Sequence, residues 1–295
     1  TEGYLFQYFP STGQMKQTEA FHNNSIKSLA LDGNGYLLAG TDNGLYVYHN
    51  DVTPLQHIIH DSRNIQSLTN NIIWNIFADQ EHNIWLGTDY GISLSRYNSA
   101  LQFIPISQIT GTGDGNQFYS LFRDSKGFYW FGGTNGLIRF TDPAGDKHNA
   151  IWYRMGDKTY PLSHNRIRHI YEDKEQQLWI ATDGSINRYD YATRQFVHYN
   201  IVDSTGTYNT NWTYYMFEDN AGHLWISTCL GGIFVVDKHR LMQSASGQYV
   251  AEQNYSVHNG LSGMFINQII PDNEGNVWVL LYNNKGIDKI NPRTR

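Results

Sequence analysis

A short pattern that recurs six times constrains the fold of this 295-residue chain more than any other feature. In five copies an aspartate, here called the anchor Asp, is followed six residues later by a tryptophan. These pairs are Asp79/Trp85, Asp124/Trp130, Asp173/Trp179, Asp219/Trp225 and Asp272/Trp278, and in the first copy Asp32 is followed by Leu38. Consecutive anchors lie 47, 45, 49, 46 and 53 residues apart. This spacing predicts one supersecondary unit that is used six times.

Each unit has the pattern of four short strands. A run rich in β-branched and aromatic residues, such as residues 72–77, precedes the anchor Asp and predicts the first strand. The anchor Asp then opens a turn, because its side chain can bond backbone amides two residues on. The Trp lies in the second strand, a second turn such as residues 89–91 leads into the third, and residues 193–199 indicate a fourth. The expected fold class is therefore all-β, a β-propeller of about six to seven four-stranded blades.

A propeller grows by adding blades, so the length predicts one domain over residues 1–295. Residues 1–20 are expected to be a third and fourth strand, and the repeat units follow at about 21–65, 66–110, 111–160, 161–205, 206–255 and 256–295. The last unit stops before a fourth strand. We therefore expect the N-terminal segment to lie beside the C-terminal unit and close the ring, which removes exposed edges. Because third strands are expected at both ends of the chain, the sequence leaves open whether the ring has six or seven blades.

The shared pattern, Asp-x-x-Gly-x-Leu-Trp-Ile-Gly-Thr-x-x-Gly-Leu-x-x-Tyr, resembles the two-component regulator propeller repeat. Residues 68–71 and 162–165 are similar to the family's Gly-Leu-Ser-x-Asn lead into the first strand. The resemblance covers nearly the whole chain. It implies the periplasmic sensor region of a hybrid two-component regulator from polysaccharide-degrading gut bacteria. It also implies an inner-membrane parent protein with an adjacent propeller and other domains, a homodimer, and a histidine kinase outside this chain.

Composition argues against two classes of partner. The formal net charge is −6 and the pI is about 6.0, whereas nucleic acids and anionic membranes select basic surfaces. No stretch approaches eighteen apolar residues, and residues 1–4 lack a basic start before an apolar run, so neither a membrane span nor a signal peptide is expected in these residues. The single cysteine, Cys229, permits no internal disulfide and is expected to be half-buried.

Register relative to the anchor Asp separates a constant position from two variable ones. The third residue before the anchor is always aliphatic or Met, which predicts core: Leu29, Ile76, Leu121, Ile170, Met216 and Ile269. The fifth and seventh residues before it vary widely, and residues two apart on a strand share a face. We interpret this variable edge as a ligand-binding rim made of Trp74, Tyr119, Arg166, Arg168, Trp212, Tyr214 and Asn267, bordered by the second-turn residues Asp89, Tyr90, Asn135 and Asp183.

The rim suits a neutral ligand rich in hydroxyl groups. Trp and Tyr rings pack on the apolar face of a sugar ring, while Arg, Asn and Asp form directional bonds with hydroxyls. The expected ligand is therefore an oligosaccharide derived from a polysaccharide. A structural alternative stays open, in which Trp74 and Trp212 wedge between blades and Arg166 and Arg168 are solvated charges. The repeated Trp residues of the second strands are expected to be packing residues.

No cofactor, metal site or catalytic residue is predicted. The Asp-x-Asn-Gly turns are similar to calcium loops, but turns such as residues 79–82 break the pattern of oxygen ligands that Ca²⁺ requires. Arg168, His169, Asp183 and Tyr214 could form an acid–base set. Three functions remain: a ligand sensor, a structural or dimerisation scaffold with the ligand site elsewhere, and, less favoured, a propeller lyase or hydrolase.

Overall fold

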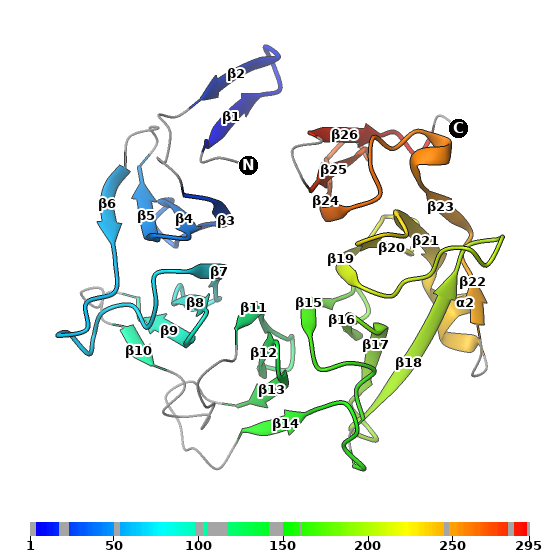
Figure 1. Ribbon diagram of the computed structural model, residues 1–295, viewed down its shortest axis with the longest axis horizontal. Helices are drawn as coiled ribbons and strands as arrows, with labels where there is room; N and C mark the ends of the chain where they lie inside the picture. Colours follow the sequence, from blue (N-terminus) through cyan, green and yellow to red (C-terminus); the bar gives the residue numbers. More distant parts are fainter. Residues whose placement is uncertain are drawn as a thin grey trace. The chain divides into compact units, whose positions relative to one another are not determined.

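The computed structural model describes residues 4–17, 24–49, 54–97, 103–105, 117–141, 150–159, 161–244, 248–282 and 286–293. Within these ranges nearly every element is a β-strand (Figure 1). The exceptions there are α2 (Lys238–Gln243) and the 3-10 turn η2 (Val257–Asn259). The chain divides into two compact units, Thr1–Arg123 with Arg139–Ala150, and Asp124–Ile138 with Ile151–Arg295.

The first compact unit contains a hairpin and two four-stranded antiparallel sheets. The hairpin consists of β1 (Phe6–Phe9) and β2 (Gln14–Gln17). The first sheet contains β3 (Ile26–Leu31), β4 (Leu37–Thr41), β5 (Gly44–Tyr48) and β6 (Pro54–Ile58). The second sheet contains β7 (Ile73–Ala78), β8 (Ile84–Thr88), β9 (Gly91–Ser95) and β10 (Phe103–Pro105). The third repeat supplies β11 (Phe118–Arg123), β12 (Tyr129–Gly133), β13 (Gly136–Phe140) and β14 (Ile151–Tyr153). The division between the two compact units falls inside this repeat.

The second compact unit holds the last three repeats. The fourth contains β15 (Ile167–Glu172), β16 (Leu178–Thr182), β17 (Ser185–Asp190) and β18 (Gln195–Val202), and β22 (Gln248–Val250) pairs in parallel with β18. The fifth contains β19 (Thr213–Glu218), β20 (His223–Thr228), β21 (Ile233–Asp237) and β23 (Gln253–Tyr255). The sixth contains β24 (Ile266–Pro271), β25 (Val277–Leu281) and β26 (Ile287–Ile290).

The sequence predicted that the N-terminal segment lies beside the C-terminal unit, but the described strands of these two segments do not pair with each other. Among the described strands, β1 pairs with β2 as a sheet of its own, and the sixth repeat has three strands. Closure by the N-terminal segment therefore stays a prediction, as does a single domain over the whole chain.

The anchor Asp organises the first turn of every repeat. Its Oδ1 accepts the backbone N–H groups of the second and fourth residues after it, at 2.8–3.0 Å in all six repeats. In five repeats Oδ2 accepts the indole N–H of the second-strand Trp at 2.7–3.0 Å. The six-residue spacing therefore lets one carboxylate hold both a turn and an indole ring, which is buried in four of these five repeats and partly buried at Trp278.

The hydrophobic core lies between consecutive sheets. In the first compact unit one buried cluster joins Leu38 and Leu45 of the first repeat to Ile73 and Ile76 of the second. The predicted core position, three residues before the anchor, is buried in the last five repeats. Leu29 is the exception, because 48% of its surface is exposed and the prediction for it is wrong. In the second repeat the equivalent residue, Ile76, faces Gly40 of the first repeat.

Candidate ligand-binding rim

The fifth residue before the anchor is a β-bulge residue. In five repeats the register between the first and second strands shifts at this position, which leaves one residue out of the ladder: Lys27, Trp74, Arg168, Tyr214 and Asn267. A bulge bends the strand and re-aims the side chain that it carries. The bulge explains why this position varies while the third residue before the anchor stays apolar. The sequence argument assumed that side chains alternate regularly along the first strand, and this assumption does not hold at the bulge residue.

Each bulge residue lies beside the second turn of its own repeat, fifteen residues further along the chain. Three of the pairs are polar: Lys27 Nζ lies 2.8 Å from Asp42 Oδ1, the Trp74 indole N–H donates to the Asp89 carboxylate, and Arg168 Nε lies 2.7 Å from Asp183 Oδ1. The sequence predicted that Asp89 and Asp183 border the same edge as the first strand, and these contacts agree. Lys27 and Asp42 were not selected from the sequence, although the same spacing could have found them.

The first compact unit brings together the Trp74 cluster, defined as Lys27, Asp42, Trp74, Asp89 and Tyr119. The ammonium group of Lys27 lies 4.2 Å from the centre of the Trp74 ring, and Tyr119 meets that ring edge-on at 5.3 Å. Partial burial acts against the charged form of Asp42, but the hydrogen bond and charge of Lys27 outweigh it and lower the pKa of Asp42. The cluster combines two half-buried aromatic rings with charged groups.

The second compact unit brings together the Arg168 cluster, defined as Arg166, Arg168, Asp183 and Tyr214. Arg168 binds both carboxylate oxygens of Asp183, at 2.7 and 3.2 Å, and its guanidinium group lies 4.5 Å from the centre of the Tyr214 ring. Arg166 Nε lies 3.8 Å from Asp183 Oδ2. Burial raises the pKa of Tyr214, against the effect of the Arg168 charge. A bidentate pair of this kind fixes the guanidinium plane.

The other predicted rim residues are more exposed. Trp212 is 48% exposed, so it is not a wedge between blades, and its φ of 56° is the left-handed conformation. Its N–H donates to the Asp183 carbonyl and its own carbonyl accepts the N–H of Cys229, each at 3.0 Å. Tyr90, Asn135 and Asn267 are exposed. Cys229 is fully buried rather than half-buried as predicted.

His169 lies apart from the residues with which it could have formed an acid–base set. Its Nδ1 accepts the backbone N–H of Met216 at 3.3 Å, and its ring stacks on Tyr215 with the centres 3.9 Å apart. Arg168, by contrast, faces Asp183 and Tyr214. The four candidates Arg168, His169, Asp183 and Tyr214 therefore do not converge, and burial lowers the pKa of His169 to about 3.

The lowered pKa of His169 predicts that the folded protein loses stability in acid. The unfolded chain binds a proton near the ordinary His pKa of about 6.5, while the folded chain resists protonation down to about 3, so the free energy of unfolding should fall as pH falls through this window. We expect a slope of about 1.4 kcal/mol per pH unit from this one group. Urea unfolding at pH 7, 6 and 5 measures it. His169→Gln should flatten the profile by about that slope, and identical profiles for the two proteins would contradict the assignment.

Comparison with known proteins identifies the type of repeat. A family profile described as the two component regulator propeller matches residues 67–90, 112–135 and 161–184. The chain is an all-β propeller, and these three matched segments are two-component regulator propeller repeats.

Individual proteins give a more specific likeness. The chain is 95% identical to the extracellular domain of a hybrid two-component system from B. thetaiotaomicron, and the match covers 100% of this chain and 40% of that one with a TM-score of 0.64. It is 26% identical over 205 residues to histidine kinase P4 of Formosa agariphila, which is 64% of this chain and 13% of that protein. PorZ of Porphyromonas gingivalis, a component of the type-IX secretion system, shares the fold alone: the identity is 13%, the TM-score is 0.74, and the match covers 98% of this chain and 43% of that one. The chain thus spans less than half of each of these proteins. None of the described helices has the length and apolar character that a membrane crossing requires.

Proposed function

We propose that this chain is the periplasmic ligand-sensing propeller of a hybrid two-component regulator. In this function it binds an oligosaccharide derived from a polysaccharide and signals to a histidine kinase elsewhere in a longer protein. The likeness to an extracellular domain of such a system supports the cellular role. A homodimer and an adjacent propeller in the parent chain belong to the same proposal.

The observation that carries the ligand assignment is the bulge position. Five repeats place their most variable side chain on a bulge beside the second turn, and bulges concentrate next to functional sites. In the Arg168 cluster a fixed guanidinium lies against an aromatic ring, and in the Trp74 cluster an indole lies beside a carboxylate. Rings offer an apolar face to a sugar, while the charged groups exchange hydrogen bonds with its hydroxyls.

A thermal-shift screen against defined oligosaccharides tests this function. A ligand that binds only the folded state at about a hundred times its dissociation constant should add about 2.7 kcal/mol to the free energy of unfolding. We expect one class of glycan to raise the melting temperature. Arg168→Gln should reduce this shift, because the variant loses both the charge and the bidentate geometry. Trp74→Leu tests the other cluster in the same way.

Tyr97→Ala is the matched control. Tyr97 is exposed and lies near the first turn, where its hydroxyl contacts Asn34 at 3.4 Å, so its loss should leave the glycan shift intact. No shift with any glycan would favour the scaffold, in which the propeller holds its neighbours and the ligand binds elsewhere. Accumulation of a cleaved product with time would favour a lyase or hydrolase.

A further inference from the structure

The first repeat lacks the ring that its anchor Asp would otherwise hold. Leu38 occupies the place of the second-strand Trp. Asp32 Oδ1 still accepts the N–H groups of Asn34 and Tyr36, each at 2.8 Å, so the turn is intact. Within the described part of the chain, Asp32 Oδ2 has no hydrogen-bond donor, whereas in the other five repeats the indole N–H supplies one.

A second large side chain is missing at the same place. In β13 of the third repeat and β17 of the fourth, the fourth residue after the first one of the strand is aromatic: Phe140 and Tyr189. The equivalent residue of the second repeat is Ser95, at the end of β9. Where both large residues are present they contact each other. Trp85 meets Phe140 at 6.4 Å between ring centres, and Trp130 meets Tyr189 edge-on at 5.0 Å.

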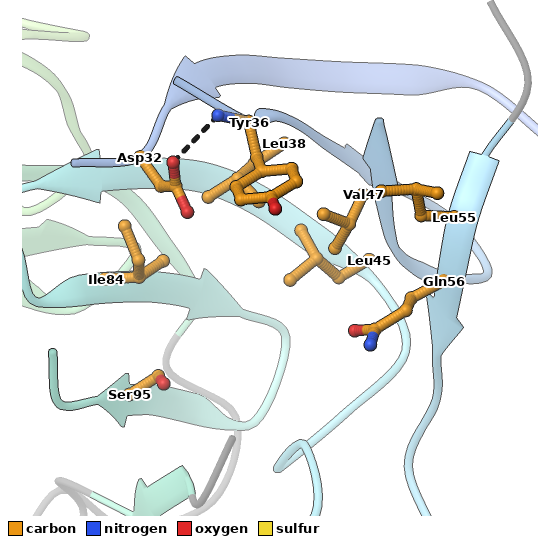
Figure 2. Close-up of a pocket in the computed structure, with 9 residues that line it drawn as sticks. All are labelled: Asp32, Tyr36, Leu38, Leu45, Val47, Leu55, Gln56, Ile84 and Ser95. Atoms are coloured by element: carbon orange, nitrogen blue, oxygen red, sulfur yellow. Dashed lines mark hydrogen bonds between the residues drawn. The ribbon is translucent and has the colours of Figure 1, made fainter. Parts of the chain in front are cut away.

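The two smaller residues, Leu38 and Ser95, both line a pocket of about 330 Å³ in the first compact unit. Leu38, Tyr36 and Leu55 line it from the first repeat, and Ile84 and Ser95 line it from the second. Figure 2 shows the Asp32 carboxylate at one end of this space, beside Tyr36 and directed toward Ile84 of β8. The walls are mainly apolar, and the one carboxylate among them has an oxygen available to accept a hydrogen bond.

We propose that this pocket binds a small planar aromatic molecule that carries an N–H donor, of the indole class. The other repeats show the chemistry: an indole ring occupies this place and donates its N–H to the anchor carboxylate at 2.7–3.0 Å. A dry cavity of about 150 Å³ is enough for benzene in another protein, so this pocket has room for two fused rings. The ligand completes the missing contact from outside the chain.

The pocket is separate from the ligand-binding rim. It lies at the first-turn end of the repeat, where Asp32 is, whereas Lys27 and Asp42 of the rim meet at the second turn. The proposal therefore does not depend on oligosaccharide binding, and the two sites can be tested independently.

Calorimetric titration of the protein with indole, and with indene as the isostere without the N–H group, tests the proposal. Indole should bind once per chain with a dissociation constant of about 1 mM or tighter. Asp32→Asn keeps the Oδ1 acceptor of the turn and replaces Oδ2 by an NH₂ group. It should weaken indole binding about tenfold, because a hydrogen bond to a charged acceptor is lost, and leave indene binding nearly unchanged.

Filling the pocket from within gives the second test. Leu38→Trp should abolish the binding of both probes and raise the melting temperature, because it restores the ring and its bond to Asp32. Ser95→Phe fills the pocket from β9 and serves if the first variant does not fold. Leu86→Ile, a volume-conserving change in the same buried cluster but outside the pocket lining, is the control that should retain binding. Absence of saturable indole binding, or equal binding by the folded Leu38→Trp variant, would overturn the proposal.

Discussion

Lys238→Met should lower the free energy of unfolding by about 3–5 kcal/mol, the usual result of leaving a buried charge without its partner. Lys238 begins α2 and is completely buried. Its Nζ lies 2.8 Å from Glu218 Oε1 and 3.2 Å from Asp173 Oδ2. Removing the ammonium group would leave two carboxylates close together with little access to water. The variant therefore loses an attraction and gains a repulsion.

The ion pairs of Lys238 also affect its pKa. Burial acts against the charged form, but the hydrogen bond to Glu218 and the charge of Asp173 outweigh it and raise the pKa of Lys238. Met fills a similar volume, so the loss measures the charge rather than a cavity. Urea unfolding monitored by Trp fluorescence gives the free energy.

Lys174→Met is the matched control for Lys238. Lys174 is exposed and its Nζ contacts the Asp219 carbonyl at 2.9 Å and Asn220 Oδ1 at 3.0 Å, so its replacement should cost less than about 1 kcal/mol. Adding Glu218→Gln to Lys238→Met should recover part of the loss, because one of the two uncompensated charges disappears. Equal losses for Lys238→Met and Lys174→Met would show that the buried charge is not important for stability.

Trp130→Ala should cost about 3–5 kcal/mol of unfolding free energy, because it leaves a cavity in a tightly packed aromatic group. The Trp130 side chain is completely buried and contacts Tyr153 and Tyr189 at 5.8 and 5.0 Å between ring centres. Its indole N–H donates to Asp124 Oδ2 at 2.7 Å. The substitution removes both the ring and the hydrogen bond.

Trp130→Phe separates these two contributions. Phe keeps most of the apolar contact and loses the hydrogen bond, which should cost about 1.5–3 kcal/mol for a charged acceptor. Trp212→Ala is the control, since Trp212 is exposed and its replacement should change stability by less than about 1 kcal/mol. Chemical unfolding of the three variants measures the differences. A small loss for Trp130→Ala would contradict the packing assignment of the repeated Trp.

Sequence reasoning was sufficient for the features that depend on neighbouring residues. The anchor Asp and the Trp six residues later are joined by a turn and one hydrogen bond, so their spacing predicted the strands, the turns and the buried rings. It also placed Asp89 and Asp183 at the same edge as the first strand, because the two strands of a hairpin are close in sequence. The interpretation of the variable edge as a rim remains a prediction.

Other features depended on contacts between repeats. Leu29 follows the core pattern in sequence yet is exposed, because burial depends on a neighbouring repeat. The bulge that aims Trp74 and Arg168 is a one-residue shift in strand pairing, which residue periodicity does not report. Lys238 meets Glu218 at the end of β19 and Asp173 in the turn after β15, and nothing near Lys238 in the sequence marks these two carboxylates.

The sequence by itself determined the repeat and the class of fold, since six copies of one local hydrogen-bonded pattern leave few ways to bury their rings. The tertiary structure alone decided which side chains meet: the Trp74 and Arg168 clusters, the buried Lys238, and the pocket at Leu38 and Ser95. The physical reason is that local turns and strands depend on residues a few positions apart. Packing and ion pairing instead depend on residues that come together only when one repeat stacks on the next.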